Sequence, residues 1–169
     1  MNSDIETQLR RCRTNLRDSG RGYILFGLWT AIKVFMTATM NKKYLNDVLD
    51  AVDTEHMDAD AVKLIPVMTV LVFLIIALVA VIVHLYIGLS AIRYSSGKKK
   101  TKFFLIFAAI IILMNLVTIP SYFLNYEDLI ARYNDSAAAS TLVDLTVSFL
   151  LADIIYSVYR MDKLKKMRV

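Results

Sequence analysis

The residues that could do chemistry are four strongly polar side chains that interrupt long apolar stretches: Lys33, His84, Asn115 and Asp153. If each stretch is a membrane helix, a rise of 1.5 Å per residue places all four about 10–20 Å from the same side of the membrane. Ionisable residues inside a membrane are costly and often mark ion or proton pathways. We therefore expect an intramembrane polar layer that either holds the helices together or forms part of a transport pathway.

Lys33 and Asp153 are the two charged members of this layer. Side chains in a helix lean toward its N-terminus, so a lysine on an outgoing helix and an aspartate on an ingoing helix lean toward each other. Distance permits a charge pair, although nothing in the sequence requires it. His84 is the one member that could change its charge near neutral pH.

His84 lies on a helical stripe of small residues, namely Ala77, Ala80, Gly88 and Ala91. Small residues allow membrane helices to approach closely, so this stripe predicts a face that meets another helix.

Asp144 is a second acid in the stretch that holds Asp153. Nine residues correspond to two and a half helical turns, so the two acids lie on roughly opposite faces, with Ser148 and Ala152 beside Asp144. Either this acid of the outer half reaches water, or its helix is sandwiched between its own bundle and another subunit.

Four apolar stretches must position these residues: 22–40, 64–92, 103–124 and 137–159. About 20 apolar residues are enough for one membrane span. Hydrophobic residues make up 57 % of the 169 residues, against roughly 45–50 % in soluble domains. The sequence therefore predicts an all-α integral membrane four-helix bundle and excludes a soluble enzyme.

Charge alternates between the segments that flank the spans. Lys and Arg gather in 1–21, 93–102 and 160–168, whereas 41–63 and 125–136 are mainly acidic. Basic segments stay on the cytoplasmic side, which predicts that both termini are cytoplasmic, in a plasma membrane or a bacterial inner membrane. The net charge of +5 thus reflects orientation, and no nucleic-acid partner is expected because no binding motif is present.

The N-terminal segment predicts an amphipathic helix over 1–20, followed by the bundle with its basic tail over 21–169. A capping-box pattern opens the helix, Ser19-Gly20 is expected to end it, and its arginines could reach an anionic cytoplasmic leaflet. A helical contact with another subunit and a solvated lead-in helix are the alternatives. Its apolar face consists of Ile5, Leu9, Cys12 and Leu16.

Motifs for catalysis or cofactor binding are missing from the sequence. A single cysteine excludes paired-cysteine redox chemistry, and we find no phosphate-binding glycine loop, no Ser/His/Asp set and no metalloprotease helix. His56 lies in an acidic stretch over 53–60 without the ordered ligand spacing of a calcium loop. We therefore expect no enzyme activity, no cofactor and no metal.

Two classes of function are consistent with this pattern. The first is a non-enzymatic membrane subunit, scaffold or regulator that acts through helix–helix contacts, with a homo-oligomer or a partner membrane subunit. The second is a small oligomeric proton- or ion-coupled transporter or channel that uses the Lys/His/Asp layer. The sequence lacks a recognisable inverted repeat and a glycine-broken helix, which favours the first class.

Overall fold

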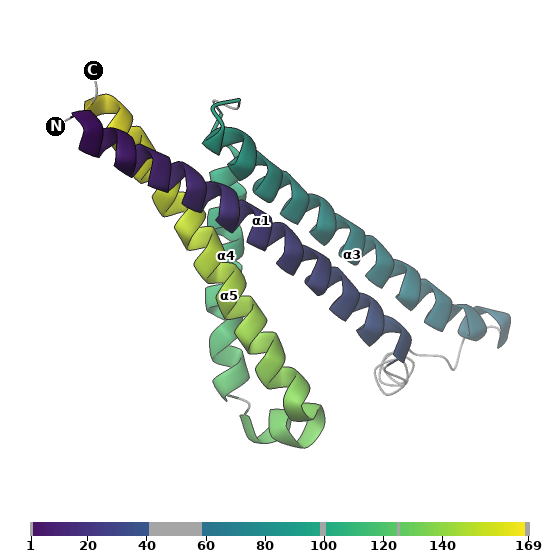
Figure 1. The fold of residues 1–169 in the computed structure, drawn as a ribbon. Coiled ribbons are helices and arrows are strands. Elements are labelled where there is room, and N and C mark those ends of the chain that lie inside the picture. The colour runs from purple at the N-terminus through teal and green to yellow at the C-terminus, as the bar shows by residue number, and fades with distance from the viewer. Residues whose placement is uncertain (1, 41–58, 99–100, 125, 168–169) are drawn as a thin grey trace. The chain divides into compact units, whose positions relative to one another are not determined.

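The protein is all-helical throughout the part described by its computed structural model, which covers residues 2–40, 59–98, 101–124 and 126–167. Figure 1 shows the four helices in this part, and no strand occurs there. They are α1 (Asn2–Met40), α3 (Ala59–Ser95), α4 (Phe104–Leu124) and α5 (Tyr126–Met167). The four apolar stretches lie in these four helices, apart from Phe103 at the edge of α4. The helical class predicted from the sequence is therefore confirmed.

The chain divides into two compact units, each of which contains parts of α1 and α3. The first unit comprises Met1–Phe26 and His84–Val169, and the second comprises Gly27–Val83. The described surface of the second unit is rich in exposed apolar side chains, including Trp29, Leu71 and Leu78. The first unit holds nearly all of the buried apolar core.

α1 does not end at Ser19-Gly20, so this expected helix stop is wrong. The helix continues without a break to Met40. A helix-ending glycine needs a left-handed backbone or a free turn, but here Gly20 lies in the helix and packs against the backbone of α3. The amphipathic segment and the first apolar stretch are consequently one helix.

The core of the first unit is formed in part by an antiparallel pairing of α1 with α5. Ser19 bonds to Asp153, and Gln8 lies within hydrogen-bond distance of Arg160, so the residue numbers rise along one helix as they fall along the other. The first turn of α1 and the last turn of α5 consequently lie at the same end of this unit (Figure 1). Buried stripes at heptad-like spacing line the two helices: Leu9, Cys12, Leu16, Ser19 and Tyr23 of α1, and Val147, Leu151, Ile154, Val158 and Met161 of α5.

This pairing changes the interpretation of the N-terminal apolar face. Leu9, Cys12 and Leu16 are at most 6 % exposed, so protein covers the side chains that were expected to lie on a lipid leaflet. The arginines remain on the exposed faces of the same helix. The stripe is amphipathic as predicted, but its apolar side belongs to the core.

The turn after α3 is built by one glycine. Gly97 has a φ of 75°, a left-handed conformation that costs glycine little. Its N–H donates to the Tyr94 carbonyl, and the Lys98 N–H donates to the Arg93 carbonyl at 2.9 Å. These two bonds form a Schellman motif, which ends α3 and directs the chain toward α4.

Within the residues that the structure describes, two helices are long and apolar enough to cross a membrane. They are α3 over Leu64–Ser95 and α5 over Thr141–Met167. The described apolar part of α4, Phe104–Val117, is shorter than this.

Candidate functional site: polar contacts between the helices

Asp153 lies against α1, where it accepts a hydrogen bond from Ser19. The Ser19 Oγ to Asp153 Oδ2 distance is 2.5 Å, and the serine is almost fully buried. Hydrogen bonds to an ionised acceptor are short and about twice as strong as neutral ones. The contact joins residues 134 positions apart, so it stabilises the pairing of α1 with α5.

His84 stacks on Tyr23, one helical turn further along α1 from Ser19. The ring centroids are 4.7 Å apart and the planes differ by 15°. The Tyr23 side chain is fully buried, and its hydroxyl has no hydrogen-bond partner among the residues that the structure describes. Two successive turns of α1 thus contact both the histidine of α3 and the aspartate of α5.

α1 and α3 approach each other backbone to backbone beside this pair. A Cβ placed on Gly20 would lie 2.9 Å from the Gly88 carbonyl oxygen, and one on Gly88 would lie 2.7 Å from the Gly20 carbonyl oxygen. Ala91, on the same stripe of α3, is fully buried. The prediction that this small-residue face meets another helix is therefore confirmed at Gly88 and Ala91.

Asn115 joins α4 to the other face of α5. Its Nδ2 donates to Ser148 Oγ at 3.0 Å and also lies 3.5 Å from the Asp144 carbonyl oxygen. Ser148 in turn donates to that carbonyl at 2.8 Å. The backbone of Asp144, rather than its carboxylate, takes part in this contact.

These contacts show what covers the two polar faces of α5. The Ser148 face meets α4 through Asn115, and the Asp153 face meets α1 through Ser19. The helix is therefore sandwiched between two helices of its own chain, and a second subunit is not needed to cover either contact.

A further polar cluster lies beyond the apolar part of α5, near the chain termini. Asp162 accepts a hydrogen bond from the Tyr94 hydroxyl at 2.7 Å and forms an ion pair with Lys102. Lys165 lies over the Tyr94 ring, 5.4 Å from its centroid, which is within the range of a cation–π contact. The cluster connects the end of α3, the residues before α4, and the end of α5.

Charge sets the protonation of this cluster. Partial burial alone would raise the pKa of Asp162. The hydrogen bonds from Lys102 and Tyr94 and the charges of Lys102 and Lys165 together hold that pKa below its usual range. The cluster is not predicted from the sequence, although Asp162 is the one acid within the basic segment 160–168. A lone acid among cations was the signal that could have found it.

Three of the four residues of the expected polar layer make separate contacts with other side chains. His84 contacts Tyr23, Asp153 contacts Ser19, and Asn115 contacts Ser148. The side chain of Lys33 lies outside the described residues, so its pairing with Asp153 stays a prediction. His56 and the acidic stretch around it also lie outside them, except for Ala59 and Asp60.

The described residues contain no group of three or more His, Cys, Asp or Glu side chains that could hold a metal ion. No protein-family model, curated protein or solved structure matches the chain.

Proposed function

We propose that this chain is a four-span integral membrane protein with both termini in the cytoplasm. It acts as a non-enzymatic subunit, scaffold or regulator through helix–helix contacts. The observation that carries the proposal is the surface of α3, whose 32-residue apolar stretch Leu64–Ser95 has only 6 % of its most apolar window buried. Water disfavours so much exposed apolar surface, whereas lipid or the helix of a partner accommodates it.

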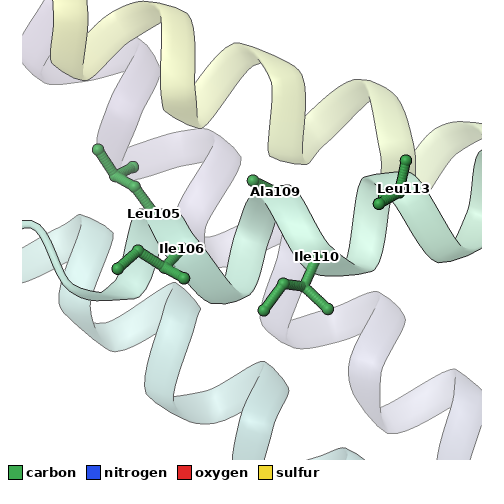
Figure 2. Close-up of a pocket in the computed structure, with 5 residues that line it drawn as sticks. All are labelled: Leu105, Ile106, Ala109, Ile110 and Leu113. Atoms are coloured by element: carbon green, nitrogen blue, oxygen red, sulfur yellow. The ribbon is translucent and has the colours of Figure 1, made fainter.

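α4 supports the same conclusion from the first unit. Five side chains from successive turns line a shallow cavity of about 400 Å³, and Figure 2 shows that they carry only carbon atoms. A surface without any hydrogen-bonding side chain suits acyl chains or an apolar helix. The five residues are Leu105, Ile106, Ala109, Ile110 and Leu113.

The membrane part of the proposal is tested by fractionation and cysteine labelling. Alkaline carbonate should leave the protein in the membrane pellet. Cys12 is buried, so its silence toward a thiol reagent would be uninformative, and the topology test starts from Cys12→Ala. A membrane-impermeant reagent should then label Asp58→Cys in intact cells, while Arg13→Cys should react only after the cells are opened. Labelling of Arg13→Cys from outside would overturn the orientation.

The subunit part is tested by photo-crosslinking from the exposed face of α3. A photoreactive residue at Leu78, which is 60 % exposed, should give one discrete protein adduct in native membranes. The matched position is Ala91, which is fully buried, and it should give no intermolecular adduct. The same experiment is repeated at the exposed Leu71 and Ile75. If all three positions crosslink only to lipid, the result would argue against a partner helix.

The second candidate is a proton- or ion-coupled transporter, and it is favoured by one observation. His84 contacts Tyr23 and Asp153 contacts Ser19, so a histidine and an aspartate lie against successive turns of α1. If this is a pathway, His84→Gln should abolish a pH-dependent flux in proteoliposomes while the protein remains folded. Wild-type vesicles without flux above empty liposomes between about pH 5.5 and 8 would exclude a proton pathway at His84.

A further inference from the structure

A cavity of about 370 Å³ opens near the chain termini, between the first turns of α1 and the last turns of α5. Gln8 lines it from α1. The other lining residues belong to α5: Tyr156, Tyr159, Arg160, Lys163, Leu164 and Met167. Every one of these residues belongs to the first unit, so the cavity is built within one compact body.

The lining carries two cations and no carboxylate. Arg160 and Lys163 contribute a guanidinium and an ammonium group, which are the side chains that bind phosphate. Asp4 accepts a hydrogen bond from the Gln8 amide at 3.3 Å but does not line the cavity. The cavity is therefore positively charged and suited to an anion.

Gln8 helps to orient the arginine. The Arg160 Nη2 atom lies 3.4 Å from the Gln8 Oε1 atom, so one N–H of the guanidinium points toward α1. A guanidinium has five N–H donors, and the remaining ones are available to a ligand. A positioned fork of donors recognises a phosphate group better than a freely rotating one.

The lining also contains exposed aromatic and apolar side chains. Tyr156 and Tyr159 are more than half exposed, and Met167 is similarly exposed. Tyrosine is typical of the boundary between headgroups and acyl chains, where one end of the ring is apolar and the other is wet. Cations beside exposed phenol rings at the end of an apolar helix match the two halves of a phospholipid.

We propose that this cavity binds the phosphate of an anionic phospholipid in the cytoplasmic leaflet. The inference rests on the proposed membrane topology, which places residue 159 at the cytoplasmic boundary of α5. Arg160 and Lys163 hold the headgroup phosphate, and Tyr156 and Tyr159 flank the start of the acyl chains. The site differs from the exposed arginines of α1, because it is a shaped cavity and not a general basic surface.

The test uses the full chain in a neutral detergent, titrated with phosphatidylglycerol and followed by melting temperature and by native mass spectrometry. Phosphatidylglycerol should raise the melting temperature and remain bound in the spectra, whereas phosphatidylcholine should do neither. The double variant Arg160→Gln/Lys163→Gln should weaken binding by about tenfold or more, because two charge-assisted hydrogen bonds are lost. The matched control Lys166→Gln removes a charge from the same helix without touching the cavity, and its affinity should remain within about twofold of the wild type.

Each outcome of this experiment decides the proposal. Equal losses in the double variant and the control would show a general electrostatic attraction and overturn the site. The same stabilisation by inorganic phosphate at equal concentration would show that the cavity takes a free anion, not a lipid. Both substituted side chains are exposed, so the variants should keep the helical circular dichroism of the wild type. The Tyr156→Ala variant, which leaves both cations in place, should also weaken phosphatidylglycerol binding, and unchanged binding there would contradict the lipid orientation.

The proposal can fail independently of the proposed function. A protein that stays in the carbonate-resistant pellet but binds no phosphatidylglycerol refutes this site alone. A protein released by carbonate refutes the membrane assignment on which the site rests.

Discussion

Replacing Gly88 by alanine should separate α1 from α3 at their closest point. The new Cβ would clash with Cγ1 of Ile24 and would lie 2.7 Å from the Gly20 carbonyl oxygen. The isoleucine side chain can rotate away, but the carbonyl belongs to a helix backbone and cannot move alone. The two helices must therefore shift relative to each other around the buried Tyr23–His84 stack.

The magnitude follows from two opposing effects. Overpacking a tight contact costs about 1–3 kcal/mol, while alanine in a helix interior is favoured over glycine by about 1 kcal/mol. The net loss in the free energy of unfolding should be about 1 kcal/mol. Because the new Cβ meets a backbone carbonyl, relaxation of side chains alone cannot remove the cost of overpacking.

Gly22, which lies in α1 and not in α3, provides a control at a helical glycine without a backbone clash. A Cβ at Gly22 meets only the Leu150 methyl groups, at 3.4 and 3.5 Å, which is ordinary van der Waals contact. Gly22→Ala should therefore gain stability by up to about 1 kcal/mol from helix propensity. The free energy of unfolding should therefore differ by about 2 kcal/mol between the two variants. It should lie below the wild-type value in Gly88→Ala and above it in Gly22→Ala.

The assay is unfolding in mixed micelles with a rising mole fraction of SDS, followed by circular dichroism. The midpoint should fall for Gly88→Ala and rise for Gly22→Ala. A Gly88→Ala variant as stable as Gly22→Ala would refute the backbone contact between α1 and α3, because a Cβ at Gly22 meets no backbone atom of another helix.

Three further outcomes are expected from the other contacts. Asn115→Ala should lower the free energy of unfolding by about 0.6 kcal/mol, the average for an interhelical hydrogen bond in a membrane. Adding Ser148→Ala should lower it little further, because both substitutions remove the same hydrogen bond. Additive losses in the double variant would mean that the two side chains have separate partners. The pKa of Asp162 is lowered in the folded protein. The ionised carboxylate therefore stabilises the folded state fully above the unfolded pKa of about 4. This stabilisation is lost as pH falls through the folded pKa. The melting temperature of Asp162→Asn should thus lie below that of the wild type at pH 7 and converge with it in acid, and a gap unaffected by pH would contradict the ion pair with Lys102. Gly97→Ala should lower the free energy of unfolding by about 1 kcal/mol, because alanine is strained in the left-handed backbone of this turn. The strain is conformational, since nothing lies within 4 Å of the new Cβ. A variant that unfolds at the wild-type temperature would show that the turn relaxes.

The helices were predictable because hydrophobic patterning and length are local properties of the chain. The stripe of Ala77 to Ala91 also predicted a helix contact, since small residues have few other uses at that spacing. The expected stop at Ser19-Gly20 failed for the opposite reason. Serine and glycine resemble an ending in sequence, but here a distant aspartate binds the serine and a second glycine packs on the first.

The partners of the polar residues were less predictable than their positions. Depth along a helix placed His84 and Asp153 near one another, but which side chain each contacts depends on how the helices are rotated. Tyr23 was not among the residues expected in the layer. Its burial is a consequence of three helices meeting, which no local pattern records.

The bond between Ser19 and Asp153 also has a consequence for the order in which the protein assembles. Synthesis proceeds from the N-terminus, so Leu9, Cys12 and Leu16 emerge long before the stripe of α5 that covers them. Contacts between residues so distant in the chain form late, and an uncovered apolar stripe favours aggregation in the meantime. The apolar stripe of α1 therefore stays uncovered during synthesis until residues 147–161 of α5 have been made.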